Sequence, residues 1–236
     1  MKTNLKALVL IAGSTLFPLF AFGQAAVGLG VVGKIYVSSV RGTAECATLA
    51  SLADTSSGGL IGEEGRITVL RKGRTVIGNG SVISTGKASS VTLVFSNQTA
   101  MFLDENTQIE IRRFDQEPFA PNNNLLIEPS NSATRIIVKI GRVVIDTPRL
   151  QSGTRMAFET RHANIDVLNV EASGDKVFIE VTERQTHVAM IQGEADVTPL
   201  GAHVVTRLTL GKQAYVKYTV GSEIGVETIT STHRPG

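Results

Sequence analysis

The chain has 236 residues, of which 23 are lysine or arginine and 21 are aspartate or glutamate. Two of the lysines lie in an N-terminal segment that we expect to be removed, and without them the counts are equal. A nearly neutral chain lacks the excess positive charge that nucleic-acid binding requires, and the single cysteine, Cys46, excludes an internal disulfide.

The first residues are typical of a secretory signal peptide. A basic start is followed by an apolar run over 7–22, and small residues at the −3 and −1 positions place the cleavage site between Gly23 and Gln24. A cut after Ala25 is nearly as good. The run is short for a membrane span of about 20 apolar residues, which favours cleavage over an uncleaved anchor. We expect a signal peptide over 1–23 and a periplasmic or extracellular protein.

Residues 24–33 are rich in glycine and predict a flexible lead-in. Gly28, Gly30 and Gly33 match the G-x-G-x-x-G pattern of dinucleotide sites. That pattern binds pyrophosphate only where a helix leaves it, and here the apolar alternation of a strand follows. We therefore expect no nucleotide cofactor.

Alternation of apolar and polar residues dominates the rest of the chain up to residue 220. The alternating runs are short, rich in β-branched residues and bounded by Gly, Asn, Asp or Ser, as strands are. They cover 34–40, 66–70, 91–95, 109–112, 136–145, 177–182, 187–191 and 213–220. This predicts an all-β domain over 34–220, an elongated twisted stack of short, mostly antiparallel strands, like a β-sandwich or solenoid. Little helix is expected, with Thr43–Asp54 the best candidate.

Two short polar segments, Ser96–Thr99 and Asp104–Thr107, interrupt the apolar runs of 89–111. Polar residues between strands occur in active-site loops and in plain turns, and we interpret both segments as turns. A longer polar segment over 115–134 predicts a loop insertion, and 221–236 forms a C-terminal tail. Structural turns are expected at Gly86, Asn97, Asn106, Gly141, Gly193 and Gly211.

Catalytic and metal-binding patterns are not evident. The four histidines are scattered without metal-ligand spacing, and neighbouring carboxylates such as Glu63 and Glu64 point to opposite faces of a strand. Tryptophan is absent, which disfavours an aromatic platform for sugars. We expect no catalytic residue, no cofactor and no metal. A polysaccharide-acting enzyme stays open only if Asp146, His162 and Asp166 converge on one pocket.

Residues 78–111 resemble the FecR family, named for the periplasmic regulator of ferric-citrate uptake. The residues that match its pattern are Gly80, Val82, Thr85, Gly86, Ser89, Leu93, Phe95, Leu103, Asn106, Thr107, Ile109 and Ile111. Further matches at 136–145, 158–160, 191–197 and 208–216 extend the resemblance over about 34–220. The family's Arg-Gly-Thr-x-Phe segment is replaced here by residues 165–171, which lack the Gly-Thr pair.

The resemblance implies a binding module rather than an enzyme. Sensor members of the family control a sigma factor through a cytoplasmic region and a membrane span, but only about six residues precede the apolar run here. We do not carry over that role. We expect an exported, non-catalytic module of the envelope that binds another protein or a surface polymer through strand edges and loops. The alternative is a periplasmic signalling component that acts with a separate membrane regulator.

The signal-peptide prediction has a direct test. N-terminal sequencing of the protein recovered from the cell envelope or medium should begin at Gln24, or at Ala26 if the second site is used. A protein that begins at Met1 would contradict export by cleavage.

Overall fold

The described part of the chain is built from strands. The computed structural model describes residues 30–48, 67–120, 124–168, 174–217 and 226–230 and contains no helix in these ranges. The strands are β1 (Val31–Val32), β2 (Lys34–Arg41), β3 (Ala44–Thr48), β4 (Ile67–Val69), β5 (Thr75–Ile77), β6 (Ser81–Thr85), β7 (Ser90–Phe95), β8 (Ala100–Leu103), β9 (Gln108–Gln116), β10 (Ser132–Asp146), β11 (Arg155–Glu159), β12 (Ala163–Leu168), β13 (Lys176–Val181), β14 (Gln185–Gln192), β15 (Glu194–Pro199), β16 (Thr206–Leu208), β17 (Lys212–Lys217) and β18 (Val226–Thr230).

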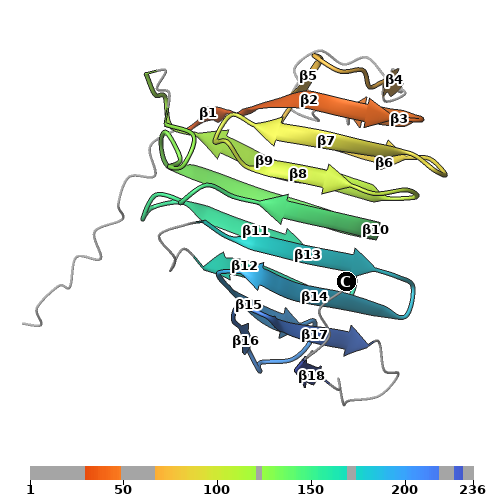
Figure 1. Cartoon of the computed structure of the whole chain (residues 1–236), viewed down its shortest axis with the longest axis vertical. Helices are drawn as coiled ribbons and strands as arrows, with labels where there is room; N and C mark the ends of the chain where they lie inside the picture. Colours follow the sequence, from red (N-terminus) through yellow and green to blue (C-terminus); the bar gives the residue numbers. More distant parts are fainter. Residues whose placement is uncertain (1–29, 49–66, 121–123, 169–173, 218–225, 231–236) are drawn as a thin grey trace, which may run out of the picture.

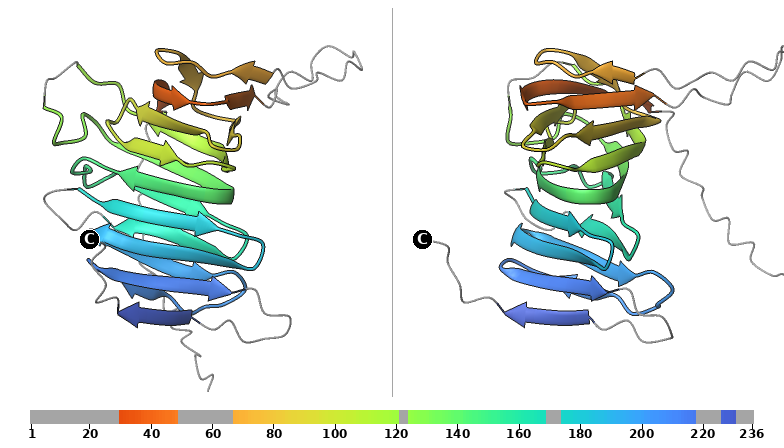
Figure 2. Two further views of the ribbon diagram at one scale, coloured as in Figure 1. Left: turned by 45° about the vertical axis from the view of Figure 1, so that its right-hand side comes forward. Right: turned by 90° about the vertical axis from the view of Figure 1, so that its right-hand side faces the viewer.

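The strands form two facing layers stacked along the long axis of the molecule (Figures 1 and 2). Layer A has the order β4-β3-β6-β9-β10-β11-β12-β15-β16, with β1 paired to the end of β9. Layer B has the order β5-β2-β7-β8-β10-β13-β14-β17-β18. All these pairs are antiparallel except β10–β11. The predicted all-β fold class is confirmed, and the sheet stays open at both ends.

The long strand β10 belongs to both layers. Its first part pairs with β9 and β11 in layer A, and from Gly141 onward it pairs with β8 and β13 in layer B. Gly141 has φ +95, a conformation that residues with a Cβ rarely adopt. A Cβ at this position would lie 2.3 Å from the hydroxyl oxygen of Thr107. The passage between layers therefore needs a residue without a side chain.

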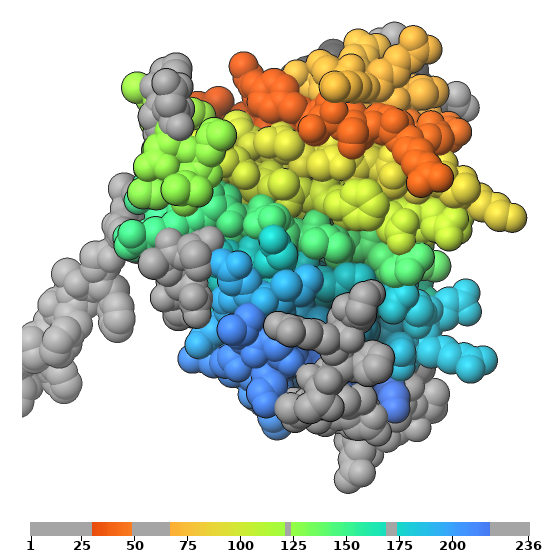
Figure 3. Space-filling model, in the orientation of Figure 1, coloured from red at the N-terminus to blue at the C-terminus, as the bar shows by residue number. Residues whose placement is uncertain are grey.

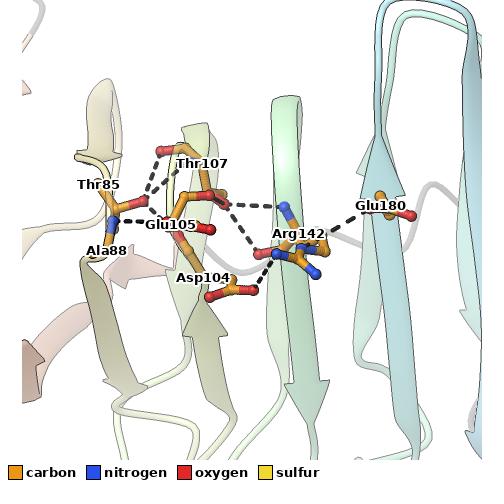
Figure 4. A network of polar contacts seen from close by, with 7 residues as sticks. All are labelled: Thr85, Ala88, Asp104, Glu105, Thr107, Arg142 and Glu180. Carbon is orange, nitrogen blue, oxygen red and sulfur yellow. Dashed lines mark hydrogen bonds and ion pairs between the residues drawn. The ribbon is translucent and has the colours of Figure 1, made fainter.

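Thr107 and its neighbours hold this passage in place (Figure 4). The backbone N–H of Arg142 donates to Thr107 Oγ1 at 3.0 Å, and the N–H of Thr107 donates to Thr85 Oγ1 at 3.0 Å. The Thr85 hydroxyl in turn donates to the carbonyl of Asp104 at 2.5 Å. The Arg142 guanidinium lies between the carboxylates of Asp104 and Glu180, at 2.9 and 3.9 Å. The second polar segment, Asp104–Thr107, thus forms a corner that links β6, β9 and β10.

The core lies between the layers and explains the alternating sequence. Successive side chains of a strand point to opposite faces, so each strand sends every second residue inward. The largest buried side chains include Phe95, Phe114 and Phe158, and the first two rings meet edge to face with centroids 5.0 Å apart. With no tryptophan, the remaining volume is filled mainly by Val, Ile and Leu.

The six residues predicted at turns are found in different structural settings. Asn106 (φ 51), Gly193 (φ 82) and Gly211 (φ 73) lie between strands of opposite layers. Gly86 follows β6, where its N–H donates to Thr43 O at 3.0 Å. Asn97 lies in the β7–β8 hairpin. Gly141, in contrast, lies inside the continuous strand β10.

Some sequence predictions differ from the structure. The helix predicted over Thr43–Asp54 is wrong for Ala44–Thr48, which forms β3, because Ala44 and Cys46 alternate with less buried neighbours as a strand requires; the rest of that segment lies outside the described residues. Part of the predicted lead-in, Val31–Val32, forms β1, and part of the predicted tail forms β18. The insertion predicted over 115–134 corresponds to a connection of residues 117–131.

Replacing Gly141 tests the importance of the passage between layers. We expect Gly141→Ala to lower the free energy of unfolding by about 3 kcal/mol, because strained backbone and a clash with Thr107 add. The matched control is Gly201→Ala. Gly201 also has positive φ (+77), but no atom lies within 4 Å of an added Cβ. It should lose about 1 kcal/mol. Urea unfolding monitored by circular dichroism measures both values, and equal losses would contradict this account.

Candidate functional site

The outer face of layer A carries a row of charged residues across six strands. The row is set by the strand register, in which Arg113 pairs with Arg135, Arg135 with Ala157, Ala157 with Asp166, Asp166 with Asp196 and Asp196 with Arg207. Directly paired residues lie on the same face of a sheet. Segments far apart in the sequence therefore meet in one line.

Ala157 makes a gap in this row. Its methyl group is much shorter than the arginine on one side and the aspartate on the other, so an open groove of about 650 Å³ lies over β10, β11 and β12. The polar side chains of the groove include Arg113, Arg135, Arg155, Asn164 and Asp166. We call this depression the layer A groove.

The charges of the layer A groove are only partly neutralised within the protein. Arg135 forms an ion pair with Glu159, and Arg113 forms one with Asp115 at 2.5 Å. Among the described residues, Arg155 forms no ion pair. One cation of the groove is therefore left for a ligand.

Asp166 supplies a carboxylate on β12, the strand next to that of Arg155. Its pKa is raised, first by burial and then by the negative charge of Asp196 on the next strand. Asp196 itself is held by Arg207, whose nitrogens lie 2.9 and 3.0 Å from the two carboxylate oxygens, and this hydrogen bonding lowers its pKa. Arg207 is thus engaged by Asp196, and within the described ranges Asp166 has no ion pair of its own.

The structure does not bring Asp146, His162 and Asp166 together. Asp146 ends β10 in layer B and pairs with Lys176 at 2.9 Å, whereas Asp166 lies on layer A. His162 is buried in the β11–β12 turn, where its Nδ1 lies 2.9 Å from the Thr186 hydroxyl and burial lowers its pKa. No group of three or more His, Cys, Asp or Glu side chains within the described residues is placed to hold a metal ion. Asp146, His162 and Asp166 therefore do not form one site.

A second polar cluster surrounds Glu128 on the 117–131 connection. One carboxylate oxygen accepts from the Gln151 N–H at 2.9 Å and from the Thr154 hydroxyl at 2.5 Å. The other accepts from the Ser132 hydroxyl at 2.5 Å and from the Asn97 side-chain amide at 3.4 Å. Glu128 is 1% exposed, and burial raises the pKa of its carboxyl. The cluster ties the connection to the β7–β8 hairpin and to the segment before β11.

Sequence reasoning missed the groove residues and Glu128. The alternation marks Arg135 and Asp166 as outward-facing. Arg113 has the parity of the buried Ile109 and Ile111, and it faces outward only because β9 has a bulge at this point. Only the register of β9, β10, β11 and β12 places the three charged residues side by side. Asn97 lies between β7 and β8, and its contact with Glu128 depends on how a distant polar segment folds back. The predicted cleavage residues Gly23 and Gln24 lie outside the described residues.

Comparisons with known proteins leave the family open. No family model matches the chain, and no curated protein matches it. Two crystal structures of a "putative anti-sigma factor" from Parabacteroides distasonis ATCC 8503 resemble it, with TM-scores of 0.44 and 0.43 and 14% sequence identity. Each alignment covers 63% of this chain and 59% of the other. The FecR resemblance thus remains a prediction from the sequence. No helix within the described ranges is long and apolar enough to cross a membrane.

The raised pKa of Glu128 predicts how stability depends on pH. The folded state binds this proton more tightly than the unfolded state, so the stability due to Glu128 is fully present below pH 4.5 and falls as the pH rises through the raised pKa. In Glu128→Gln this decline should disappear. The variant's free energy of unfolding relative to wild type should therefore increase with pH across this window.

Urea unfolding at a series of pH values measures this difference. Glu117→Gln, which removes an exposed carboxylate from the same connection, is the control and should follow the wild-type pH dependence. A pH-independent difference between Glu128→Gln and wild type would contradict the assignment.

Proposed function

We propose that the protein is an exported, non-catalytic module of the cell envelope that binds a segment of another envelope protein in the layer A groove. The observation that supports this most directly is that an available guanidinium, Arg155, and an available carboxylate, Asp166, line one open groove on neighbouring strands. A polypeptide carries side chains of both signs next to hydrogen-bonding backbone groups. It therefore suits such a lining better than a polymer of one charge.

The shape and support of the groove agree with this proposal. Its small residues, Ala133 and Ala157, leave room for side chains of a partner, and its strands are in the middle of layer A. A site on central strands is held more rigidly than one on loops, which reduces the entropy lost on binding. The scaffolding and the signalling alternatives both need such a contact, and they differ in the partner that is bound.

Site-specific photo-crosslinking in living cells tests the proposal. With p-benzoylphenylalanine in place of Asn164, which lines the groove, we expect a covalent adduct with an envelope protein. The same photoreactive residue at Lys87, exposed at the β6–β7 corner, should give none. Ala157→Trp should fill the groove and abolish the adduct, and Arg155→Ala should lower its yield about tenfold through the loss of a charge-assisted hydrogen bond.

The adduct also separates the two alternatives. A membrane regulator in the adduct would identify the protein as a signalling component, and another envelope protein would identify it as a scaffold. The proposal fails if the adduct forms equally from position 87, or if it survives Ala157→Trp in a chain that unfolds at the wild-type urea concentration.

A further inference from the structure

The outer face of layer B differs from that of layer A, because aromatic rings recur on every second strand. Tyr36 lies on β2, Phe102 on β8, Phe178 on β13 and Tyr215 on β17, and in the order of layer B one strand separates each from the next. Each ring is at an outward-facing position, and Tyr36 and Phe102 are 44% and 38% exposed. We call these four residues the aromatic track.

The strand register gives the spacing of the rings. Phe102 and Phe178 both pair with Val144, so they lie in one row, about 10 Å apart across two strand spacings. Tyr36 and Tyr215 are each displaced by one row, on opposite sides. Tyr36 is therefore about 12 Å from Phe102. The His187 ring lies between Phe178 and Tyr215, with its centroid 5.4 Å from the first ring and 4.2 Å from the second. The track thus follows the long axis of the stack with a slight slant. Figure 3 shows that the segments from β6 and β7 onward follow one another in sequence order along this axis, whereas β4 and β5 lie beyond β2 and β3 at one end.

Small side chains separate the first three rings of the track. Phe102 and Phe178 flank Val144, and Ala100 and Ala189 take the neighbouring positions of β8 and β14. At the far end His187 stacks on Tyr215, with ring centroids 4.2 Å apart, and its Nε2 lies 3.0 Å from Gln213 Oε1. Tyr215 is therefore held in one orientation.

Polar groups line both sides of the track, and their charges are paired within the protein. On one side Arg142 lies between Asp104 and Glu180 (Figure 4). On the other side Lys176 contacts Asp146 at 2.9 Å. A strongly charged ligand would gain little from groups that already neutralise each other. An uncharged ligand with hydroxyl or amide groups along its edges can still form hydrogen bonds with them.

From this geometry we infer that the aromatic track binds an extended, uncharged β-1,4-linked glycan. The ring face of each sugar presents C–H groups that pack against the negative face of an aromatic ring. In such a chain every second sugar repeats the same orientation, and the length of two sugars matches the spacing of about 10 Å between Phe102 and Phe178. The equatorial hydroxyl or acetamido groups then reach the polar residues on both sides. The absence of tryptophan led the sequence analysis away from sugars, but the register supplies the platform with tyrosine and phenylalanine.

This inference is independent of the layer A groove, because the two sites lie on opposite faces of the molecule. An envelope module could hold a glycan on one face and a protein on the other. Failure of either proposal leaves the other intact.

Isothermal titration calorimetry of the exported chain with cellohexaose and chitohexaose tests the aromatic track. We expect at least one hexasaccharide to bind with a millimolar or lower dissociation constant, and about tenfold more tightly than the corresponding disaccharide, which cannot span two rings. Phe102→Ala and Phe178→Ala should each weaken binding at least about tenfold. Because the ligand is uncharged, raising the salt from about 50 to about 500 mM should change the affinity less than about twofold.

The control is Phe119→Ala, which removes an aromatic ring that is 41% exposed on the 117–131 connection, away from the track. It should leave glycan affinity unchanged, and near-ultraviolet circular dichroism establishes that each variant is folded. Should Phe178→Ala unfold, the more exposed Phe102 still decides the question. The inference is overturned if neither hexasaccharide binds at millimolar concentration, if binding survives both substitutions, or if only anionic glycans bind with strong salt dependence.

Discussion

The close contact between Gly141 and Thr107 is the constraint on which the rest of the structure depends. Here a single strand, β10, leaves layer A and enters layer B, and the backbone passes so near Thr107 that no side chain fits at 141. The Thr107 hydroxyl also accepts the N–H of the next residue, Arg142, so the contact is fixed by a hydrogen bond as well as by shape. β10 has a neighbouring strand on each side in both layers. The passage at Gly141 therefore fixes how the strands that precede β10 are positioned relative to the strands that follow it.

The two outer faces follow from that arrangement but differ in chemistry. The core uses only the inward half of each strand, which leaves the outward half free to vary without disturbing the packing. On layer A these positions carry charges around the short side chain of Ala157. On layer B they carry aromatic rings, with small residues between the first three and with paired charges at the sides. One scaffold can thus present a polar groove and an apolar track at the same time.

The sequence was sufficient for the fold class because alternation is a local signal, and residues such as Val91, Leu93 and Phe95 display it within a single strand. It misled at Ala44–Thr48, where alanines favoured a helix and tertiary pairing with β6 imposed a strand. Neither face could be predicted, because each depends on register between distant strands. Arg113 and Asp166 are joined through β10 and β11, and Tyr36 and Tyr215 are at opposite ends of the domain. The environment of Glu128 likewise depends on a polar connection without periodicity.

The short strands at the ends of the stack limit how it can grow. A sheet that stays open exposes backbone N–H and C=O groups at its edges, and another chain can pair with them. Here β4, β5 and β16, three of the four end strands, have only three residues each. Such a strand offers few hydrogen bonds to an incoming chain, so edge-to-edge association gains little. Among the described strands, the two-layer stack thus ends in edges that favour little further extension.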